Sequence, residues 1–224
     1  MPASIIRYPE IISLHIPKTA GTSFRNILKS VYGDDQVVRF DINEQGIKMN
    51  EQPYALKHLP EVRVIHGHFT MPSLKENFTL PENYKLITWL RDPVKRVVSN
   101  FYYLEERLTE ILKEKRELNI LNNMPRSLID YARLEFNRNK LSKFLSGTSL
   151  SDFDFIGLTE YFSEDIKRLE KILGWDRQAE TLHQNKSVNS ENDVPEETLE
   201  EIRSLNREDI KLYMEVMQLR NSRS

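Results

Sequence analysis

The stretch Ile11–Ser23, which reads IISLHIPKTAGTS, decides the fold expected for the N-terminal part of the chain. Its first half, Ile11–Ile16, is a short apolar run that a proline ends, which is the pattern of a buried β-strand entering a loop. Beyond the loop, apolar residues recur at helical spacing as far as Gly33, with Thr22 or Ser23 as candidate N-cap. The sequence therefore predicts a strand, a loop and a helix in this order.

The same alternation continues along the chain. Further strands are expected at 36–40, 61–65, 84–90 and 155–159, and further helices after residue 92, over 128–145 and 163–173, and from residue 195 onward. Asp92 and Pro93 suit the N-cap and the first position of a helix. Strands that alternate with helices imply an α/β fold with a central, mostly parallel sheet flanked by helices. We expect one domain over residues 1–224.

The composition excludes several classes of function. The 32 Lys and Arg residues are balanced by 34 Asp and Glu, so no global positive field favours nucleic acid as a partner, and any anion site must be local. The absence of cysteine excludes a disulfide framework, a thiolate nucleophile and a sulfur-based zinc site. The first residues lack the apolar core of a signal peptide and the length of a membrane span. We therefore expect a cytoplasmic protein with no membrane span.

The loop after the first strand combines the groups that bind a phosphorylated ligand. Ligands of parallel sheets lie beyond the carboxyl ends of the strands, and this loop occupies such an end. It offers a lysine, two hydroxyl donors, a glycine that permits close approach of the backbone, and the N–H groups that open the next helix. The alternative is a tight turn with a solvated lysine, which would not need all these groups together. The predicted ligand-binding residues are Pro17, Lys18, Thr19, Ala20, Gly21, Thr22 and Ser23.

The order of residues in this loop resembles one family. In the nucleotide-binding motif G-x-x-x-x-G-K-[ST] the lysine follows the second glycine, whereas Lys18 precedes Gly21 here. This order resembles the 5′-phosphosulfate loop of the sulfotransferases that use 3′-phosphoadenosine 5′-phosphosulfate (PAPS). The segment His15–Ser23 is most similar to the carbohydrate sulfotransferases of the heparan and uronyl 2-O type. The resemblance implies a P-loop nucleotide-kinase-like sulfotransferase fold, PAPS as donor, adenosine 3′,5′-bisphosphate as product, and no metal.

A second segment carries the same resemblance. Residues 91–102 (RDPVKRVVSNFY) resemble the R-D-P-x-x-R-x-x-S-x-Y segment of the family, which implies that Arg91 and Ser99 bind the 3′-phosphate of the donor. Taken alone, Arg91 could be in a surface ion pair and Ser99 could bond its own helix backbone. Arg96 could contact the donor or form an ion pair on the helix surface. Two separate motifs in the expected order favour the family interpretation.

A pair of histidines follows the strand expected at 61–65. His66-Gly67-His68 resembles the His-Gly-His of the uronyl 2-O-sulfotransferases, in which the second histidine is the catalytic base. The resemblance implies that His68 is the base and that His66 supports it, while Lys18 neutralises the oxygen of the breaking bond. Either histidine could instead only bond a backbone carbonyl at the strand end. We expect His15 to orient the loop.

Other assignments rest on weaker patterns. Asn185-Lys186-Ser187 resembles a late loop that closes over the nucleotide, which implies Lys186 and Ser187 as donor contacts. Residues 122–147 are assigned to the acceptor wall by elimination. The acceptor should be a hydroxylated substrate, either a carbohydrate or a small molecule. Because cysteines and a membrane anchor are lacking, we expect a soluble, bacterial-type member. Two other functions stay open: an ATP-dependent kinase, and a non-catalytic nucleotide-binding module.

Overall fold

The structure is a computed structural model that describes residues 8–115, 127–175 and 194–222. Its contacts divide the chain into two compact units. The first comprises Met1–Leu90 and Lys143–Gln184, and the second comprises Arg91–Ser142 and Asn185–Ser224. Each unit therefore takes two separate segments of the chain. That the whole chain acts as one domain stays a prediction.

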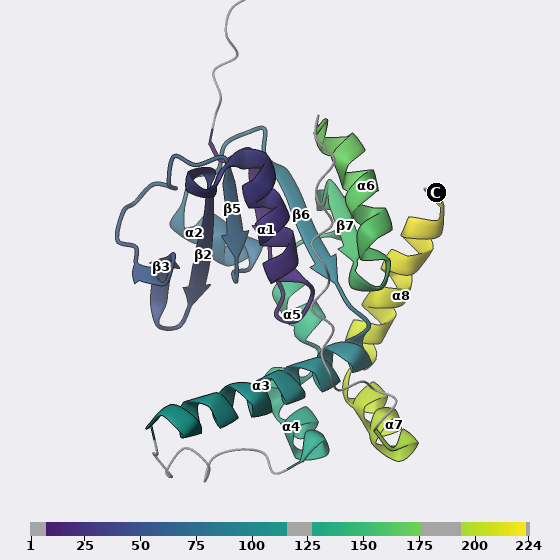
Figure 1. The fold of residues 1–224 in the computed structure, drawn as a ribbon. Helices are drawn as coiled ribbons and strands as arrows, with labels where there is room; N and C mark the ends of the chain where they lie inside the picture. The colour runs from purple at the N-terminus through teal and green to yellow at the C-terminus, as the bar shows by residue number, and fades with distance from the viewer. Residues whose placement is uncertain (1–7, 116–126, 176–193, 223–224) are drawn as a thin grey trace, which may run out of the picture. The chain divides into compact units, whose positions relative to one another are not determined.

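A mixed sheet forms the centre of the first unit (Figure 1). Its seven strands in the described residues are β1 (Ile11–Leu14), β2 (Val37–Asn43), β3 (Gly46–Met49), β4 (Gln52–Pro53), β5 (Val64–Gly67), β6 (Lys85–Leu90) and β7 (Phe155–Leu158). The strand order is β4-β3-β2-β5-β1-β6-β7. The five strands from β2 to β7 in this order are parallel, and β3 and β4 extend one edge as antiparallel strands. The predicted α/β fold with a mostly parallel sheet is confirmed.

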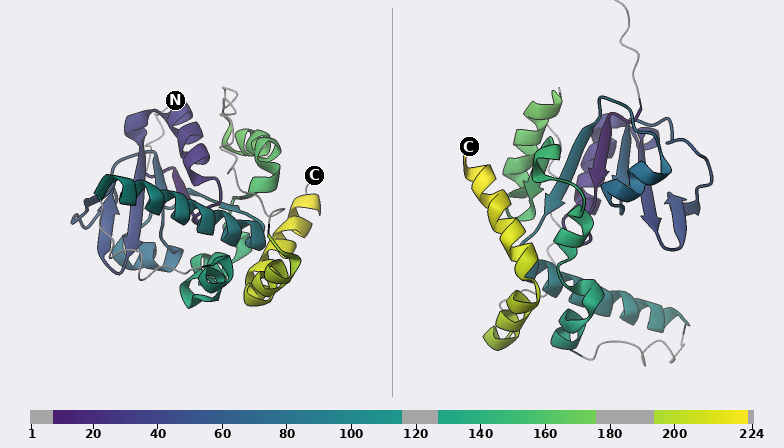
Figure 2. Two further views of the ribbon diagram at one scale, coloured as in Figure 1. Left: turned by 60° about the horizontal axis from the view of Figure 1, so that its bottom comes forward. Right: turned by 180° about the vertical axis from the view of Figure 1, so that it is seen from behind.

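Helices cover both faces of this sheet. The first unit contains α1 (Gly21–Tyr32), α2 (Met71–Asn77) and α6 (Phe162–Leu173), with short 3₁₀ turns at Asp34–Gln36, Leu150–Asp152 and Thr159–Tyr161. Figures 1 and 2 show α1 and α6 on one face and α2 on the other. The apolar stripes of α1 and α6 pack on alternate residues of the parallel strands. This core consists of Ile11, Phe24, Ile27, Leu28, Val37, Val64, Ile87, Trp89, Phe155, Phe162, Ile166 and Leu169.

The second unit is helical. It contains α3 (Pro93–Lys115), α4 (Leu128–Arg133), α7 (Glu196–Leu205) and α8 (Arg207–Ser222), with a 3₁₀ turn at Glu135–Asn137. The predicted N-cap of α3 is confirmed, because Oδ1 of Asp92 accepts hydrogen bonds from the N–H groups of Val94 and Lys95, each at 3.0 Å. Apolar residues of α3, α4 and α7, among them Val97 and Ile202, form a core of their own.

The segment 128–145, predicted to be mostly helical, consists of three short helical pieces. α4 and the 3₁₀ turn are followed by α5 (Lys140–Leu145). The buried Asn137 side chain donates to the carbonyl of Tyr131, and Asn139 adopts a left-handed φ of 46°, so the chain cannot continue as one helix. The buried carboxylate of Asp209 accepts the N–H groups of Leu141 and Ser142 and thereby starts α5.

Candidate active site

Strand pairing in the first unit brings two predicted motifs together. β1 lies between β5 and β6, and Leu14 is in register with Gly67 on one side and Thr88 on the other. The N–H of His15 donates to the carbonyl of Gly67 at 2.8 Å, and the Thr88 hydroxyl donates to the carbonyl of Leu14 at 2.9 Å. The loop that follows β1 and the His-Gly-His that ends β5 are therefore at the same edge of the sheet.

The backbone of the loop is strained. Lys18 and Ala20 adopt left-handed φ values of 69° and 60°, which residues with a Cβ rarely do. Such strain is typical of ligand-binding loops. The Thr19 side chain is buried and donates to the carbonyl of Ile16 at 2.8 Å, so this hydroxyl holds the loop in place. Any contribution of Thr19 to anion binding would come from its backbone.

The start of α1 suits an anion. The N-cap expected at Thr22 or Ser23 is wrong: the N-cap is Ala20, and the helix begins at Gly21. Alanine has no side-chain acceptor, so it cannot cap the N–H groups of the first helical turn as serine or aspartate would. An anion at this helix end would supply the missing acceptor. Thr22 is exposed and Ser23 is half-buried, so their hydroxyls are also near the surface.

Three histidine rings form a stack beside the loop. The ring of His15 lies between those of His66 and His68, with centroid distances of 4.9 and 4.5 Å. A Cβ on Gly21 would be 1.8 Å from Nε2 of His15. The imidazole of His15 therefore occupies the space that a side chain at position 21 would need. This clash is a reason for glycine in addition to the predicted close approach of a ligand. The prediction that His15 orients the loop is consistent with this contact.

Replacing Gly21 with alanine should disrupt the stack. The new methyl group must displace either the His15 ring or the start of α1, at a cost of about 1–3 kcal/mol in stability. We expect a loss of donor binding that exceeds this loss of stability, because the loop itself moves. Chemical denaturation and a donor-binding titration on the same variant check this. Unchanged donor affinity in a stably folded Gly21→Ala protein would contradict it.

His66 is a buried, neutral histidine. It is 3% exposed, and its Nδ1 shares a hydrogen bond of 2.9 Å with the hydroxyl of Ser13. Burial, followed by the positive charge of Arg25, lowers the pKa of His66 to about 3, although a hydrogen bond to the backbone of Gly21 acts in the opposite direction. The ring therefore remains uncharged at neutral pH. The His66 ring stacks on His15, which in turn stacks on His68, and the predicted role of His66 in supporting the base stays a prediction.

The low pKa of His66 predicts acid sensitivity. In the unfolded chain histidine has a pKa of about 6.5, so the unfolded state takes up the proton first, and stability falls as the pH drops from about 6.5 towards 3. His66 alone should remove about 1.4 kcal/mol per pH unit in this range. Urea denaturation at pH 7 and at pH 5.5 measures the loss. His66→Asn should reduce the pH dependence by this amount, and an unchanged pH dependence would refute the assignment.

His68 has the geometry of an oriented base. Its Nδ1 lies 2.8 Å from the carbonyl of His15 and must carry a hydrogen to bond it, which makes Nε2 the nitrogen that accepts a proton in the neutral ring. The N–H of His68 donates to Oδ1 of Asp41 at 2.9 Å. Oδ2 of Asp41 pairs with Nε of Arg39 at 2.8 Å. The ring and the backbone of His68 are thus each fixed by a separate contact.

A cavity of about 450 Å³ opens beside His68. Its walls come from β2 and from α2 with the residues before it, and include Phe144. The ring of Phe144 lies edge-on to that of His68, with a centroid distance of 6.3 Å. Of the acceptor wall predicted at 122–147, Phe144 is the one described residue that lines this cavity. Apart from Phe144 and His68, the lining consists of residues to which the sequence alone assigned no role.

The residues predicted to bind a 3′-phosphate belong to the second unit. Arg91 follows β6 directly in the sequence and is half-buried, and Ser99 is buried in α3. Arg96 is 1% exposed and donates from Nη2 to the carbonyl of Asn137 at 3.0 Å, so an ion pair on the helix surface is wrong for this residue. Burial lowers the pKa of Arg96. Lys186 and Ser187 lie outside the described residues.

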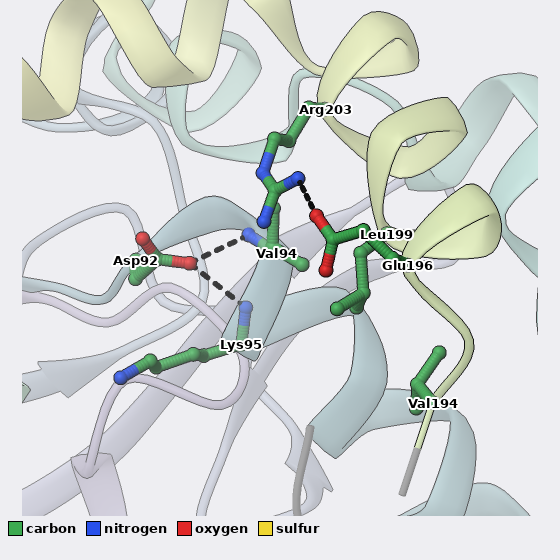
Figure 3. Close-up of a pocket in the computed structure, with 7 residues that line it drawn as sticks. All are labelled: Asp92, Val94, Lys95, Val194, Glu196, Leu199 and Arg203. Carbon is green, nitrogen blue, oxygen red and sulfur yellow. Dashed lines mark hydrogen bonds and ion pairs between the residues drawn. The ribbon is translucent and has the colours of Figure 1, made fainter. Parts of the chain in front are cut away.

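The second unit also contains a cavity of about 400 Å³ at the start of α3 (Figure 3). Its lining consists of Asp92, Val94, Lys95, Val194, Glu196, Leu199 and Arg203. Arg203 and Glu196 form an ion pair at 2.7 Å across one side of it. Arg91 and Ser99 are not part of this lining, so the cavity gives no support to their predicted roles.

Two further observations concern the described residues as a whole. None of their helices has the length and apolar character needed to cross a membrane. Among the same residues, no group of three or more histidine or acidic side chains is arranged to hold a metal ion.

A strained loop before a helix, next to an oriented histidine, is an arrangement that can bind an anion and accept a proton. The family model described as "Sulfotransferase family" matches residues 5–214, and the chain belongs to this family. Similar solved structures include mouse sulfotransferase SULT7A1 complexed with PAP, at 17% identity and a TM-score of 0.47. That match covers 77% of this chain and 61% of the mouse chain, which is less than two thirds of its length. No curated protein matches the chain.

Proposed function

We propose that the protein transfers a sulfuryl group from PAPS to a hydroxyl group of an acceptor. The observation that carries this proposal is the contact between His68 and His15. Nδ1 of His68 donates to the carbonyl of the residue that opens the segment His15–Ser23, so the base and the loop share one anchoring point. Membership of the sulfotransferase family supports the same reaction.

The loop residues fit the charged end of such a donor. We assign its 5′-phosphosulfate to the loop Pro17–Ser23, where left-handed backbone at Lys18 and Ala20 leads into the N-terminus of α1. The second motif supports Arg91 and Ser99 as ligands of the 3′-phosphate. Lys186 and Ser187 remain assigned from the sequence alone.

In the proposed mechanism the donor supplies the sulfuryl group, and the chain supplies a base and positive charge. Nε2 of His68 takes the proton of the acceptor hydroxyl as the hydroxyl oxygen attacks in line. The carbonyl of His15 accepts the Nδ1 hydrogen throughout, which stabilises the protonated ring. Lys18 offsets the negative charge that develops on the leaving phosphate oxygen. The products are a sulfate ester and adenosine 3′,5′-bisphosphate.

The finer assignments are also proposals. The acceptor is a hydroxylated molecule, and the cavity beside His68 is the place that fits it. A cytoplasmic location rests on the sequence and stays a prediction.

Two substitutions should separate the phosphate sites. Lys18→Ala should weaken binding of both adenosine 3′,5′-bisphosphate and adenosine 5′-phosphate, because both carry the 5′-phosphate. Arg91→Ala should weaken only the bisphosphate and bring its affinity close to that of the monophosphate. Since a hydrogen bond to a charged group contributes about 1.5–3 kcal/mol, each loss should be about 10- to 100-fold. Equilibrium dialysis with both nucleotides measures these affinities.

Lys29 in α1 provides the control. Its Nζ pairs with Asp34 at 2.9 Å at the far end of the helix, so Lys29→Ala removes a positive charge without touching the loop. Both affinities should stay unchanged in this variant. An Arg91→Ala protein that keeps its full preference for the bisphosphate would refute the assignment of the 3′-phosphate.

A further inference from the structure

The charges around the cavity beside His68 indicate the class of acceptor. We infer that this cavity takes an uncharged sugar, rather than the uronic acid that the His-Gly-His resemblance would imply. The inference rests on the proposed sulfuryl transfer, because only in that reaction is the molecule in the cavity an acceptor. What it predicts, however, is binding in the cavity. It can therefore be tested without turnover.

The positive charge in the cavity wall is already paired. Among the described residues of the lining, Arg39 is the one Lys or Arg. Its Nε pairs with Oδ2 of Asp41 at 2.8 Å, and its Nη1 pairs with Oε1 of Glu51 at 3.0 Å. A carboxylate on the acceptor would have to compete with both of these acids for one guanidinium.

The remaining charge of the wall is negative. The lining contains two carboxylates, Asp41 and Glu76, against the single guanidinium. Glu51 adds a third carboxylate next to Arg39. A further unit of negative charge about 4 Å away, at an exposed wall where the dielectric is close to that of bulk water, should weaken binding about tenfold. The wall thus disfavours an anionic acceptor.

Neutral hydrogen-bonding groups complete the wall. The amide of Asn77 donates one hydrogen to the carbonyl of Ser73 at 2.8 Å. Its second hydrogen and its oxygen are further hydrogen-bonding groups of this lining residue. The oxygen of Asn43 accepts from the N–H of Gln45 at 2.8 Å, which leaves its NH₂ group as a donor. Phe144 adds an aromatic surface. Amides beside an aromatic ring suit the hydroxyls and the apolar C–H face of a neutral sugar ring.

Matched pairs of methyl glycosides test the inference. The neutral glycosides of glucose, galactose and mannose are each compared with the uronic acid of the same configuration, with adenosine 3′,5′-bisphosphate present. Amide shifts of Asn43, His68 and Asn77 in ¹H–¹⁵N spectra report binding directly. At least one neutral glycoside should shift these amides and bind about tenfold more tightly than its acid. Tighter binding of the acids, or shifts with none of the glycosides, would overturn the inference.

A variant that lacks one carboxylate of the cavity wall provides a second test. Glu76→Gln removes one negative charge from the wall and should narrow the difference between neutral and acidic glycosides severalfold. Glu61→Gln removes the same charge at an exposed position outside the lining and should leave the difference unchanged. An equal effect of both variants would contradict a local role of the wall. Failure to bind the bisphosphate would instead count against the proposed function. The amide shifts would still report whether a sugar binds in the cavity.

Discussion

His68→Ala should abolish sulfuryl transfer and leave donor binding intact. The variant removes the nitrogen that accepts the hydroxyl proton, and a positioned base typically contributes about 10²–10⁴-fold to the rate. The loop keeps other contacts in this variant, among them the Thr19 hydroxyl on the carbonyl of Ile16 and the N–H of His15 on the carbonyl of Gly67, so the affinity for adenosine 3′,5′-bisphosphate should change little. A screen of hydroxylated acceptors with labelled donor identifies a working acceptor, and the rate of label transfer to it is then measured for both proteins.

An exposed histidine serves as the control. The exposed ring of His58 bonds the neighbouring carbonyl of Leu59, and His58→Ala should transfer the label at the wild-type rate. Wild-type turnover by His68→Ala at saturating acceptor would refute the assignment of the base. Loss of donor binding in the same variant would show that the ring supports the loop instead.

Gly67→Ala should cause the largest loss of stability. A Cβ on Gly67 would be 1.8 Å from the carbonyl oxygen of Phe40 and 2.6 Å from its carbonyl carbon. These are backbone atoms of β2, so neither a rotamer change nor a small shift relieves the clash. We expect a loss of about 3 kcal/mol, at the upper end for overpacking, and a fall in Tm of about 10 °C. Thermal unfolding followed by circular dichroism measures both.

Gly174→Ala separates the steric effect from a backbone effect. Gly174 ends α6 with a left-handed φ of 63°, and no atom lies within 4 Å of the position that an alanine methyl group would take there. Its replacement should cost only about 1 kcal/mol, from the strain of an alanine in this conformation. Equal losses of stability in the two variants would mean that crowding against β2 does not explain why residue 67 is a glycine.

The elements that the sequence predicted are those with strong apolar patterns. β1 and β6 are continuous apolar runs, because both faces of a central parallel strand are buried. β3 and β4 were missed because they are short strands without such a run; β3 is mostly half-buried, and β4 is the exposed edge strand. The short helix α2 was also missed. Its N-terminus does carry a signal, since Thr70 and Ser73 form a capping box, and this pattern could have located it.

The site was predictable where its residues are close in sequence. The loop and the His-Gly-His are local motifs, and their position at strand ends follows from the fold class. Arg39 and Asp41 were not predicted, because their link to His68 depends on the pairing of β2 with β5. The reason for Gly21 likewise appears only in three dimensions, where the ring of His15 fills its side-chain space.

Calorimetric titration with two nucleotides tests the central claim most directly. The protein is titrated with adenosine 3′,5′-bisphosphate and, separately, with ATP and Mg²⁺. The proposed sulfotransferase should give saturable heats with the bisphosphate and bind it more tightly than ATP, because its donor carries a 3′-phosphate. Tight binding of ATP with no binding of the bisphosphate would contradict the account and favour a kinase.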